Sequence, residues 1–194
     1  LSAVVLSTGA VYSFLLFGAP AILNSSFMVK KYENLISEKT GFPVEIKNFK
    51  FKTNPNLSFD LNVGSVLSQK DSKIDVINIK DLEYKTKFLS IKPSYVGIND
   101  VYADFSEIKS FMKDKDKKSE KNSFNLDYFP NLNIKRVFVK IDKDSTAEIQ
   151  NLKSQKVEDV GIVCTFLATV KTPYTKNPVV VGREGYIYYS NNMF

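Results

Sequence analysis

The chain has 194 residues with a formal net charge of +6, and it contains no histidine, no tryptophan and a single cysteine, Cys164. Without histidine there is no imidazole general base, no Ser-His or Cys-His nucleophile pair, and no zinc site with a histidine ligand. A lone cysteine forms neither an intrachain disulfide nor a CxxC redox pair.

The basic residues are almost entirely lysine: only Arg136 and Arg183 are arginines among the 27 basic residues. Arginine is the residue that best recognises phosphates and base edges in a bidentate manner. The longest run of lysines, residues 113–118, alternates with acidic residues and is typical of a solvated segment. We therefore predict no nucleic-acid partner in spite of the sequence pI of 9.2.

Residues 1–29 carry no charge, and the segment Ala3–Leu23 is densely apolar. As a helix, these residues would extend about 31 Å, which matches the hydrocarbon core of a bilayer. We predict a transmembrane signal anchor over residues 1–25, with a single span. The alternative is a signal peptide that is cleaved near the small residues 18–21. Because the sequence starts at Leu1 and not at Met, we expect residues to be missing before it, and charge alone does not set the orientation.

The pattern after the anchor predicts an amphipathic helix over residues 26–41. Polar residues 24–26 can cap its start, Gly41 is suited to the position after its last turn, and Pro43 prevents its continuation. The expected apolar stripe repeats with helical spacing. It consists of Met28, Tyr32, Leu35 and Ile36.

The hydrophobic period changes to 2 in residues 42–105, which predicts a β-sheet region. Residues 43–63 read as a hairpin, with turn residues at 54–56. A one-residue slip of the apolar positions predicts a bulge or a twist near Lys47 and Asn48. The apolar side chains of this hairpin are Val44, Ile46, Phe49, Phe51, Leu57, Phe59, Leu61 and Val63.

The rest of the chain continues the β pattern after one interruption. In residues 74–86 the alternation shifts twice, which predicts bulges or a strand break, and a further strand follows over 96–105. Residues 106–126 read as a charged linker or helix. Residues 127–194 form a further β region that we expect to be incomplete at its C-terminus, with Cys164 as a small buried hydrophobe on one strand.

The order of these features resembles the N-terminal region of AsmA-like proteins. The run from Leu35 to Ile46 contains their Thr-Gly-x-Pro-Val-x-Ile entry from the helix into the first strand. Residues 56–63, 77–82 and 98–101 look like the second, third and fourth strands of that family. The resemblance covers residues 3–105 and, more weakly, 130–142, and there is none beyond about residue 172.

This resemblance implies a mainly β fold with an N-terminal transmembrane helix. The sheet would be antiparallel, open and strongly twisted, with an apolar groove on its inner face. It also implies a location in the bacterial inner membrane, a β-rich body in the periplasm, and a part in moving phospholipid across the envelope. We therefore expect a membrane and phospholipid as partners, and no catalytic residue, metal or cofactor.

The apolar side chains of the 43–63 hairpin are our candidates for the lipid-lining surface. An apolar sheet face must be covered by a second layer, by a helix or by an apolar ligand. The same residues would form an ordinary core if a second layer of protein covered them. The sequence leaves this choice open.

Two other functions are alternatives to lipid binding. The first is a non-catalytic envelope assembly or scaffolding factor that binds protein partners. The second is an anchored enzyme with a Ser-Lys dyad, which needs a lysine of lowered pKa. No Ser-Met-x-Pro-like motif or phosphate-binding glycine motif occurs, and the acidic pairs Asp142/Asp144 and Glu158/Asp159 have the context of turns. We therefore predict that the protein is not an enzyme.

Overall fold

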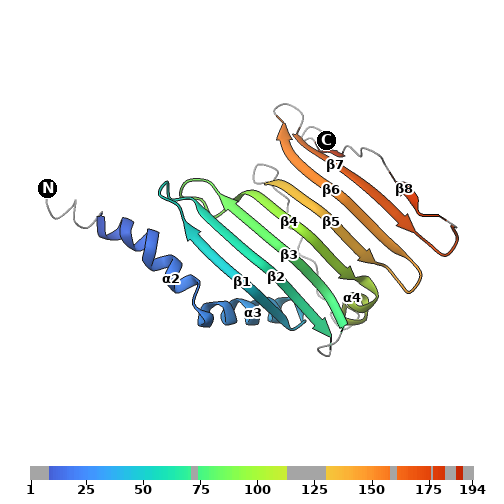
Figure 1. Cartoon of the computed structure of the whole chain (residues 1–194), viewed down its shortest axis with the longest axis horizontal. Helices are drawn as coiled ribbons and strands as arrows, with labels where there is room; N and C mark the ends of the chain where they lie inside the picture. The colour runs from blue at the N-terminus through green and yellow to red at the C-terminus, as the bar shows by residue number, and fades with distance from the viewer. Residues whose placement is uncertain are drawn as a thin grey trace.

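The computed structural model describes residues 9–70, 74–112, 130–157, 161–175, 177–181 and 187–189. These residues form a single open sheet of nine strands, preceded by a bent helical segment (Figure 1). The prediction of a mainly β, open-sheet fold is confirmed. The strands are β1 (Val44–Thr53), β2 (Phe59–Lys70), β3 (Ile74–Thr86), β4 (Pro93–Asp104), β5 (Asn131–Lys140), β6 (Thr146–Val157), β7 (Gly161–Lys171), β8 (Val179–Val181) and β9 (Ile187–Tyr189).

The first helix, Gly9–Leu23, changes its hydrogen-bond pattern midway. It contains a π-helical turn, η1 (Phe14–Gly18), followed by α2 (Ala19–Leu23). Pro20 lacks an N–H, and in a regular α-helix its ring would clash with the carbonyl four residues earlier. In the wider turn the Ala19 N–H donates to the Phe14 carbonyl, five residues back, which accommodates the proline.

Within the described residues, no single helix is both long and apolar enough to span a membrane. Gly9–Leu23 and Ser26–Thr40 reach the required length and composition only as a pair, and they meet at a bend of 65°. Large apolar side chains on the first of these helices face outward, among them Phe17 at 72% exposure. The transmembrane anchor over residues 1–25 stays a prediction.

The predicted amphipathic helix is present as α3 (Ser26–Thr40). The Ser25 hydroxyl accepts a hydrogen bond from the Met28 N–H, and Gly41 ends the helix with φ of 81°, a left-handed conformation that suits glycine. Two side chains differ from the predicted stripe: Leu35 is 50% exposed, whereas Glu33 is buried. The cause is that α3 lies along the edge of β1, where Glu33 accepts a hydrogen bond from the Ile46 N–H.

The strands follow one another across the sheet in chain order from β1 to β8, and β9 also pairs with β7. The 43–63 hairpin is confirmed as β1 and β2. The prediction of an antiparallel sheet is wrong at one pair, since β4 and β5 are parallel. Parallel neighbours need a crossover connection, and here it begins with α4 (Phe105–Met112). Of the charged segment predicted at 106–126, only this helix lies within the described residues.

The slip predicted near Lys47 and Asn48 is a twist and not an inserted residue. Asn48 has φ of 56°, yet the register is the same on both sides, with Lys47 opposite Ser65 and Phe49 opposite Val63. Asp81 in β3 and Asn151 in β6 also have positive φ, 51° and 53°. Asparagine and aspartate tolerate this left-handed conformation better than other side chains, which explains their use within strands.

These residues lie in one line across the sheet, which we call the crossing row. The flanking register pairs place its members opposite one another. They are Asn48, Gly64, Asp81, Asn99, Lys135 and Asn151. Each has a polar or glycine neighbour on its own strand, so every strand from β1 to β6 carries two successive non-apolar residues there. The alternation of apolar side chains therefore slips by one residue at the same level in all six strands.

Candidate functional site

One face of the sheet is apolar over six neighbouring strands, and we call it the apolar face. Residues that are directly opposite on paired strands share a face, so the register defines its members. They form four rows, two on each side of the crossing row. The rows are Phe51, Leu61, Tyr84, Val96 and Leu132; Phe49, Val63, Leu82, Ile98, Ile134 and Leu152; Ile46, Val66, Ile79, Val101, Val137 and Ile149; and Val44, Ile77, Ala103, Val139 and Ala147.

The candidate lining residues of the hairpin lie on this face, with one exception. Phe51 is opposite Leu61 and Phe49 is opposite Val63, and the rings of Phe51 and Phe59 stack with their centroids 5.6 Å apart. Leu57 was predicted as a strand residue, but it lies in the turn before β2 with φ of 54°. Val44 and Ile46 continue the face beyond the crossing row.

This apolar face is not the interior of a closed core. Among the residues that the structure describes, only Phe42, Val63, Val76 and Ile162 are buried hydrophobic side chains. The described strands all belong to one sheet, so no second sheet packs on it within this part of the chain. The helices contact the sheet mainly at β1, through η1, α2 and α3, and at β3 and β5, through α4.

The N-terminal helices protect the outer edge of β1. An edge strand presents unpaired N–H and C=O groups that invite pairing with other chains. Here the Asn24 amide donates to the Phe51 carbonyl at 2.8 Å and accepts from the Phe51 N–H. The Ser37 hydroxyl accepts from the Val44 N–H at 2.9 Å, and Glu33 Oε1 accepts from the Ile46 N–H at 2.8 Å. The helices therefore occupy the edge of β1, and the apolar face is the surface of this strand that remains available to a partner.

Replacing Glu33 with alanine is expected to lower the free energy of unfolding by about 1–3 kcal/mol, because the Ile46 N–H would lose its acceptor. Asn34→Ala, one residue along α3 at an exposed position, is the matched control and should change stability by less than about 0.5 kcal/mol. Urea denaturation of the detergent-solubilised chain measures both values. Equal effects of the two substitutions would contradict the edge-protecting role of Glu33.

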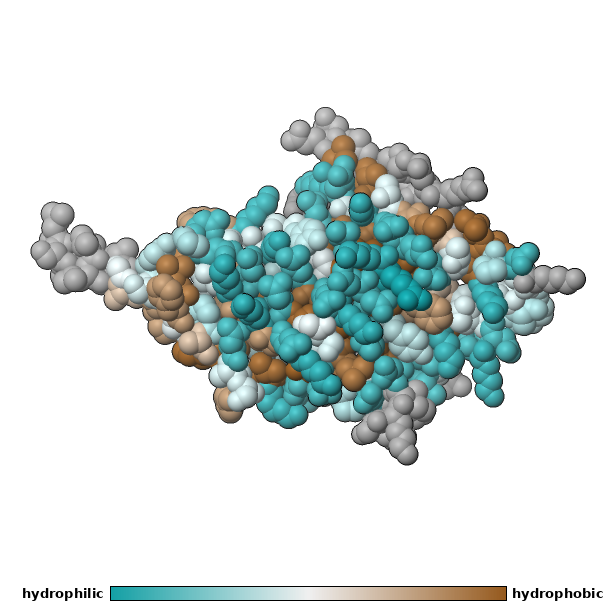
Figure 2. Space-filling model, in the orientation of Figure 1, coloured by the Kyte–Doolittle hydropathy of each residue, from teal (hydrophilic) through white to brown (hydrophobic). Residues whose placement is uncertain are grey.

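The opposite face is mainly polar, and hydrophilic residues dominate the middle of the side that Figure 2 shows. A solvent-open hollow of about 470 Å³ lies along the crossing row on this face, with Asn48, Asp81 and Asn99 among its lining residues. The Asn99 amide donates to the Asp81 carboxylate at 2.8 Å. Gly97 leaves room for the Tyr95 side chain, because a Cβ there would lie 2.7 Å from the Tyr95 hydroxyl. This hollow contains amides and charges of both signs and is not an apolar groove.

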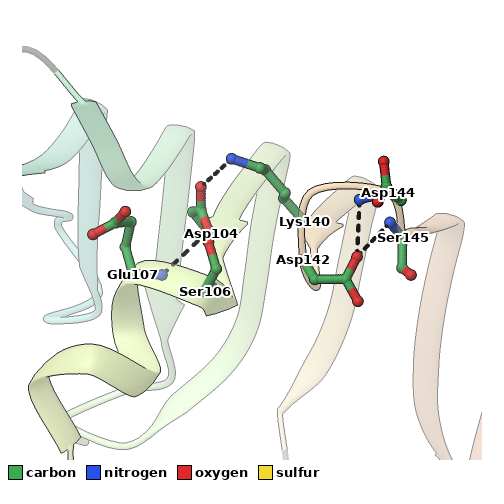
Figure 3. Close-up of polar contacts among 7 residues, drawn as sticks. All are labelled: Asp104, Ser106, Glu107, Lys140, Asp142, Asp144 and Ser145. Carbon is green, nitrogen blue, oxygen red and sulfur yellow. Dashed lines mark hydrogen bonds and ion pairs between the residues drawn. The ribbon is translucent and has the colours of Figure 1, made fainter.

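An ion pair between a buried aspartate and a partly exposed lysine, which no sequence pattern predicted, joins β4 to β5 (Figure 3). Asp104 is 1% exposed, and its carboxylate accepts from Lys140 Nζ at 2.8 Å. The same carboxylate accepts from the N–H groups of Ser106 at 3.0 Å and Glu107 at 3.3 Å, so it also caps the start of α4. Burial by itself would raise the pKa of Asp104, but the hydrogen bonds from Lys140, Ser106 and Glu107 outweigh it and lower the pKa.

The acidic pair Asp142/Asp144 lies in a turn, as predicted (Figure 3). The Asp142 carboxylate accepts from the N–H groups of Asp144 at 2.9 Å and Ser145 at 2.7 Å, which closes the connection between β5 and β6. The pair Glu158/Asp159 lies outside the described residues. Within the ranges that the structure covers, no group of three or more His, Cys, Asp or Glu side chains is placed to hold a metal ion.

Cys164 was predicted to be buried, but it is only half-buried on β7. It is opposite Ser154 of β6, which follows Leu132 in the row of Phe51. Burial raises the pKa of its thiol, which keeps the side chain neutral and makes it a poor nucleophile at neutral pH. The cysteine therefore extends the apolar surface and shows no sign of reactivity.

Comparison with known proteins found no matching family model, no matching curated protein and no matching solved structure.

Proposed function

We propose that this chain is a membrane-anchored envelope protein that binds a lipid on its apolar face and conveys it between membranes. The observation that carries this proposal is the continuous apolar face of six strands, whose side chains are mostly half-exposed, in a sheet on which no second layer packs among the described residues. An exposed apolar surface of this width is typical of an interaction site for an apolar partner.

The dimensions of the apolar face suit an acyl chain. A strand of ten residues such as β1 extends about 33 Å, whereas one leaflet of a bilayer contributes about 15 Å of hydrocarbon. Each buried methylene group contributes about 0.8 kcal/mol, so ten of them contribute about 8 kcal/mol before the cost of ordering the chain. Binding therefore needs no specific polar contact on this face.

The N-terminal segment and the resemblance to AsmA-like proteins support the proposed location. The apolar helix Gly9–Leu23 exposes several large side chains and lies beside β1, at one edge of the sheet (Figure 1). In the proposed arrangement, residues 1–25 anchor the chain in the bacterial inner membrane, and the sheet lies in the periplasm. The anchor would then hold the apolar face close to its source of lipid.

Photo-crosslinking from Phe51 tests this proposal. A benzophenone amino acid in place of Phe51 is expected to crosslink to lipid in cells, because this side chain lies on the apolar face. The same probe in place of Lys52, the next residue on the strand and an exposed one, is the matched control and should give no lipid adduct. Absence of lipid adducts at Phe51, or equal yields at both positions, would contradict lipid binding on this face.

The alternative function, an assembly or scaffolding factor, has one observation in its favour. Val179 and Val180 of β8, at the sheet edge away from the N-terminal helices, are 46% and 54% exposed. An exposed apolar edge strand can pair with a strand of another protein. A stoichiometric protein partner that co-purifies with the chain, in the absence of bound lipid, would favour this alternative.

A further inference from the structure

The loop between β3 and β4 exposes three large apolar side chains in succession. In residues 87–92, which we call the 87–92 loop, Phe88 is 63% exposed, Leu89 is 61% exposed and Ile91 is 82% exposed. Single exposed apolar residues are common on protein surfaces, but three within six residues at one loop are not. This concentration points to a partner for the loop outside the described chain.

Hydrogen bonds hold the 87–92 loop in one conformation. The Tyr84 hydroxyl donates to the Ile91 carbonyl, and the Ser90 N–H donates to the Lys87 carbonyl at 3.1 Å. The Leu89 N–H donates to the Leu57 carbonyl at 3.1 Å, which joins the loop to the turn between β1 and β2. The apolar side chains are therefore presented outward by an ordered backbone.

Leu89 in this loop and Leu57 in the neighbouring β1–β2 turn have an unfavourable backbone conformation. Leu89 has φ of 47° and Leu57 has φ of 54°, a left-handed conformation that is unfavourable for a bulky side chain. Glycine or asparagine would adopt it at lower cost. Leu89 is mostly exposed, so burial within the protein does not offset the strain. Strain of this kind is often found where a residue serves binding.

The 87–92 loop lies at the end of the sheet that the N-terminal helix contacts. The Tyr12 hydroxyl of that helix donates to the Pro55 carbonyl in the β1–β2 turn at 2.7 Å. Figure 1 shows this turn and the β3–β4 loop together at the end of the sheet nearest the N-terminus. The apolar loop and the apolar helix therefore present their side chains at the same end of the molecule.

The charges around the loop favour an acidic surface as its partner. Lys85, Lys87 and Lys92 surround the three apolar residues, and residues 85–92 contain no acidic side chain. Lys85 pairs with Glu83 at 2.8 Å, whereas Lys87 extends from an exposed position at the start of the loop. Apolar side chains flanked by lysines are suited to the headgroup region of a bilayer with anionic lipid.

We propose that the 87–92 loop inserts into the surface of a membrane that contains acidic phospholipid, as a second membrane contact beside the N-terminal helix. This inference rests on the membrane anchoring in the proposed function. It adds a fixed orientation: because Tyr12 of the N-terminal helix contacts Pro55, the β1–β2 turn and the 87–92 loop would enter the bilayer beside that helix, and the apolar rows of Phe51 and Phe49 would begin next to it. Lipid would then pass from the bilayer onto the sheet at this end.

Depth-dependent fluorescence quenching tests the loop contact. An NBD label is attached to the cysteine of a Phe88→Cys substitution in the Cys164→Ala chain, which is reconstituted into phosphatidylcholine vesicles with or without phosphatidylglycerol. Lipids that carry a quencher near the headgroup are expected to lower the Phe88-site emission at least about twofold, and more strongly with phosphatidylglycerol. The matched control is a label at Tyr174, which is 94% exposed in the connection after β7.

Quenching at Phe88 but not at Tyr174 supports the proposal. No quenching at either position, or equal quenching at both, would overturn it, as would a Phe88 signal that does not depend on phosphatidylglycerol. The Lys87→Glu variant, which changes charge but no apolar side chain, should weaken the phosphatidylglycerol effect. Crosslinking from Phe51 reports lipid on the sheet independently, so failure of the loop contact and failure of lipid binding give different results.

Discussion

Replacing Asp104 with alanine is expected to lower the free energy of unfolding by about 2–3 kcal/mol, because several hydrogen bonds to a buried carboxylate would be lost together. The substitution would leave the Lys140 ammonium group without its partner at 2.8 Å. It would also remove the acceptor for the Ser106 and Glu107 N–H groups at the start of α4. Urea denaturation of the solubilised chain measures the loss.

The matched control for this substitution is Asp142→Ala. Asp142 also accepts two backbone hydrogen bonds, at 2.9 and 2.7 Å, but it is exposed. Its loss is therefore expected to cost about 1 kcal/mol or less. An equal cost for the two substitutions would contradict the view that Asp104 holds the parallel β4–β5 connection together.

The same carboxylate predicts how stability depends on pH. Because the pKa of Asp104 is lowered in the folded chain, its contribution is fully present above the unfolded value of about 3.9 and is lost as the pH falls through the folded value. The wild-type chain should therefore lose stability on acidification below about pH 4 more steeply than Asp104→Asn, which does not titrate there. Parallel acid profiles of the two proteins would show that Asp104 does not carry this dependence.

The local elements of this fold were predictable because each depends on a few neighbouring residues. The cap at Ser25, the stop at Gly41 and the alternation in the 43–63 hairpin are local signals, and the structure contains α3, β1 and β2 where they indicate. The slip near Asn48 was also visible, since Lys47 and Asn48 interrupt the apolar alternation. Only the turn position of Leu57 departs from the predicted hairpin.

The pairing of distant strands was not predictable in the same way. The parallel arrangement of β4 and β5 depends on a crossover between Asp104 and Asn131, and its direction is not encoded in the alternation of either strand. The role of Glu33 was not predictable from the sequence for a related reason. Helical periodicity places it away from the apolar stripe, but an edge strand with a free N–H at Ile46 needs an acceptor there.

The candidate site shows the same division between local and distant information. The apolar residues of β1 and β2 were identified from their own alternation, whereas the extension of the face to β6 needs the register of every intervening strand. The sequence nevertheless contains one signal of this register. Each of the six strands has two successive non-apolar residues within an otherwise alternating run, such as Lys80-Asp81 and Lys135-Arg136. Aligning the strands on these pairs would have placed them in the observed register.

The crossing row has a consequence for function as well as for prediction. A simple alternating strand that contained these polar pairs would turn its apolar side chains to the other face beyond them. In β1, β3 and β6 the left-handed residues Asn48, Asp81 and Asn151 reverse the pleat at that level. Apolar side chains on both sides of the row, such as Ile46 and Phe49, therefore share one face. The sheet gains an apolar surface as long as its strands, and the polar pairs remain on the opposite face.

A charge on the apolar face is therefore expected to weaken lipid binding strongly, whereas the same charge on the other face should not. Leu61 and Asn62 are successive residues of β2 on opposite faces: Leu61 is paired with Phe51 and Tyr84, and Asn62 lines the polar hollow. An aspartate in hydrocarbon costs about 3 kcal/mol, so Leu61→Asp should weaken binding about a hundredfold. Asn62→Asp, the matched control, should change it less than about twofold. Titration of the purified full-length chain with an NBD-labelled phospholipid measures both affinities, and urea denaturation checks that both variants remain folded. If the folded Leu61→Asp protein bound the phospholipid as well as Asn62→Asp does, the lipid would not lie on the apolar face. The two substitutions introduce the same charge at successive residues, and they differ in the face on which the charge lies.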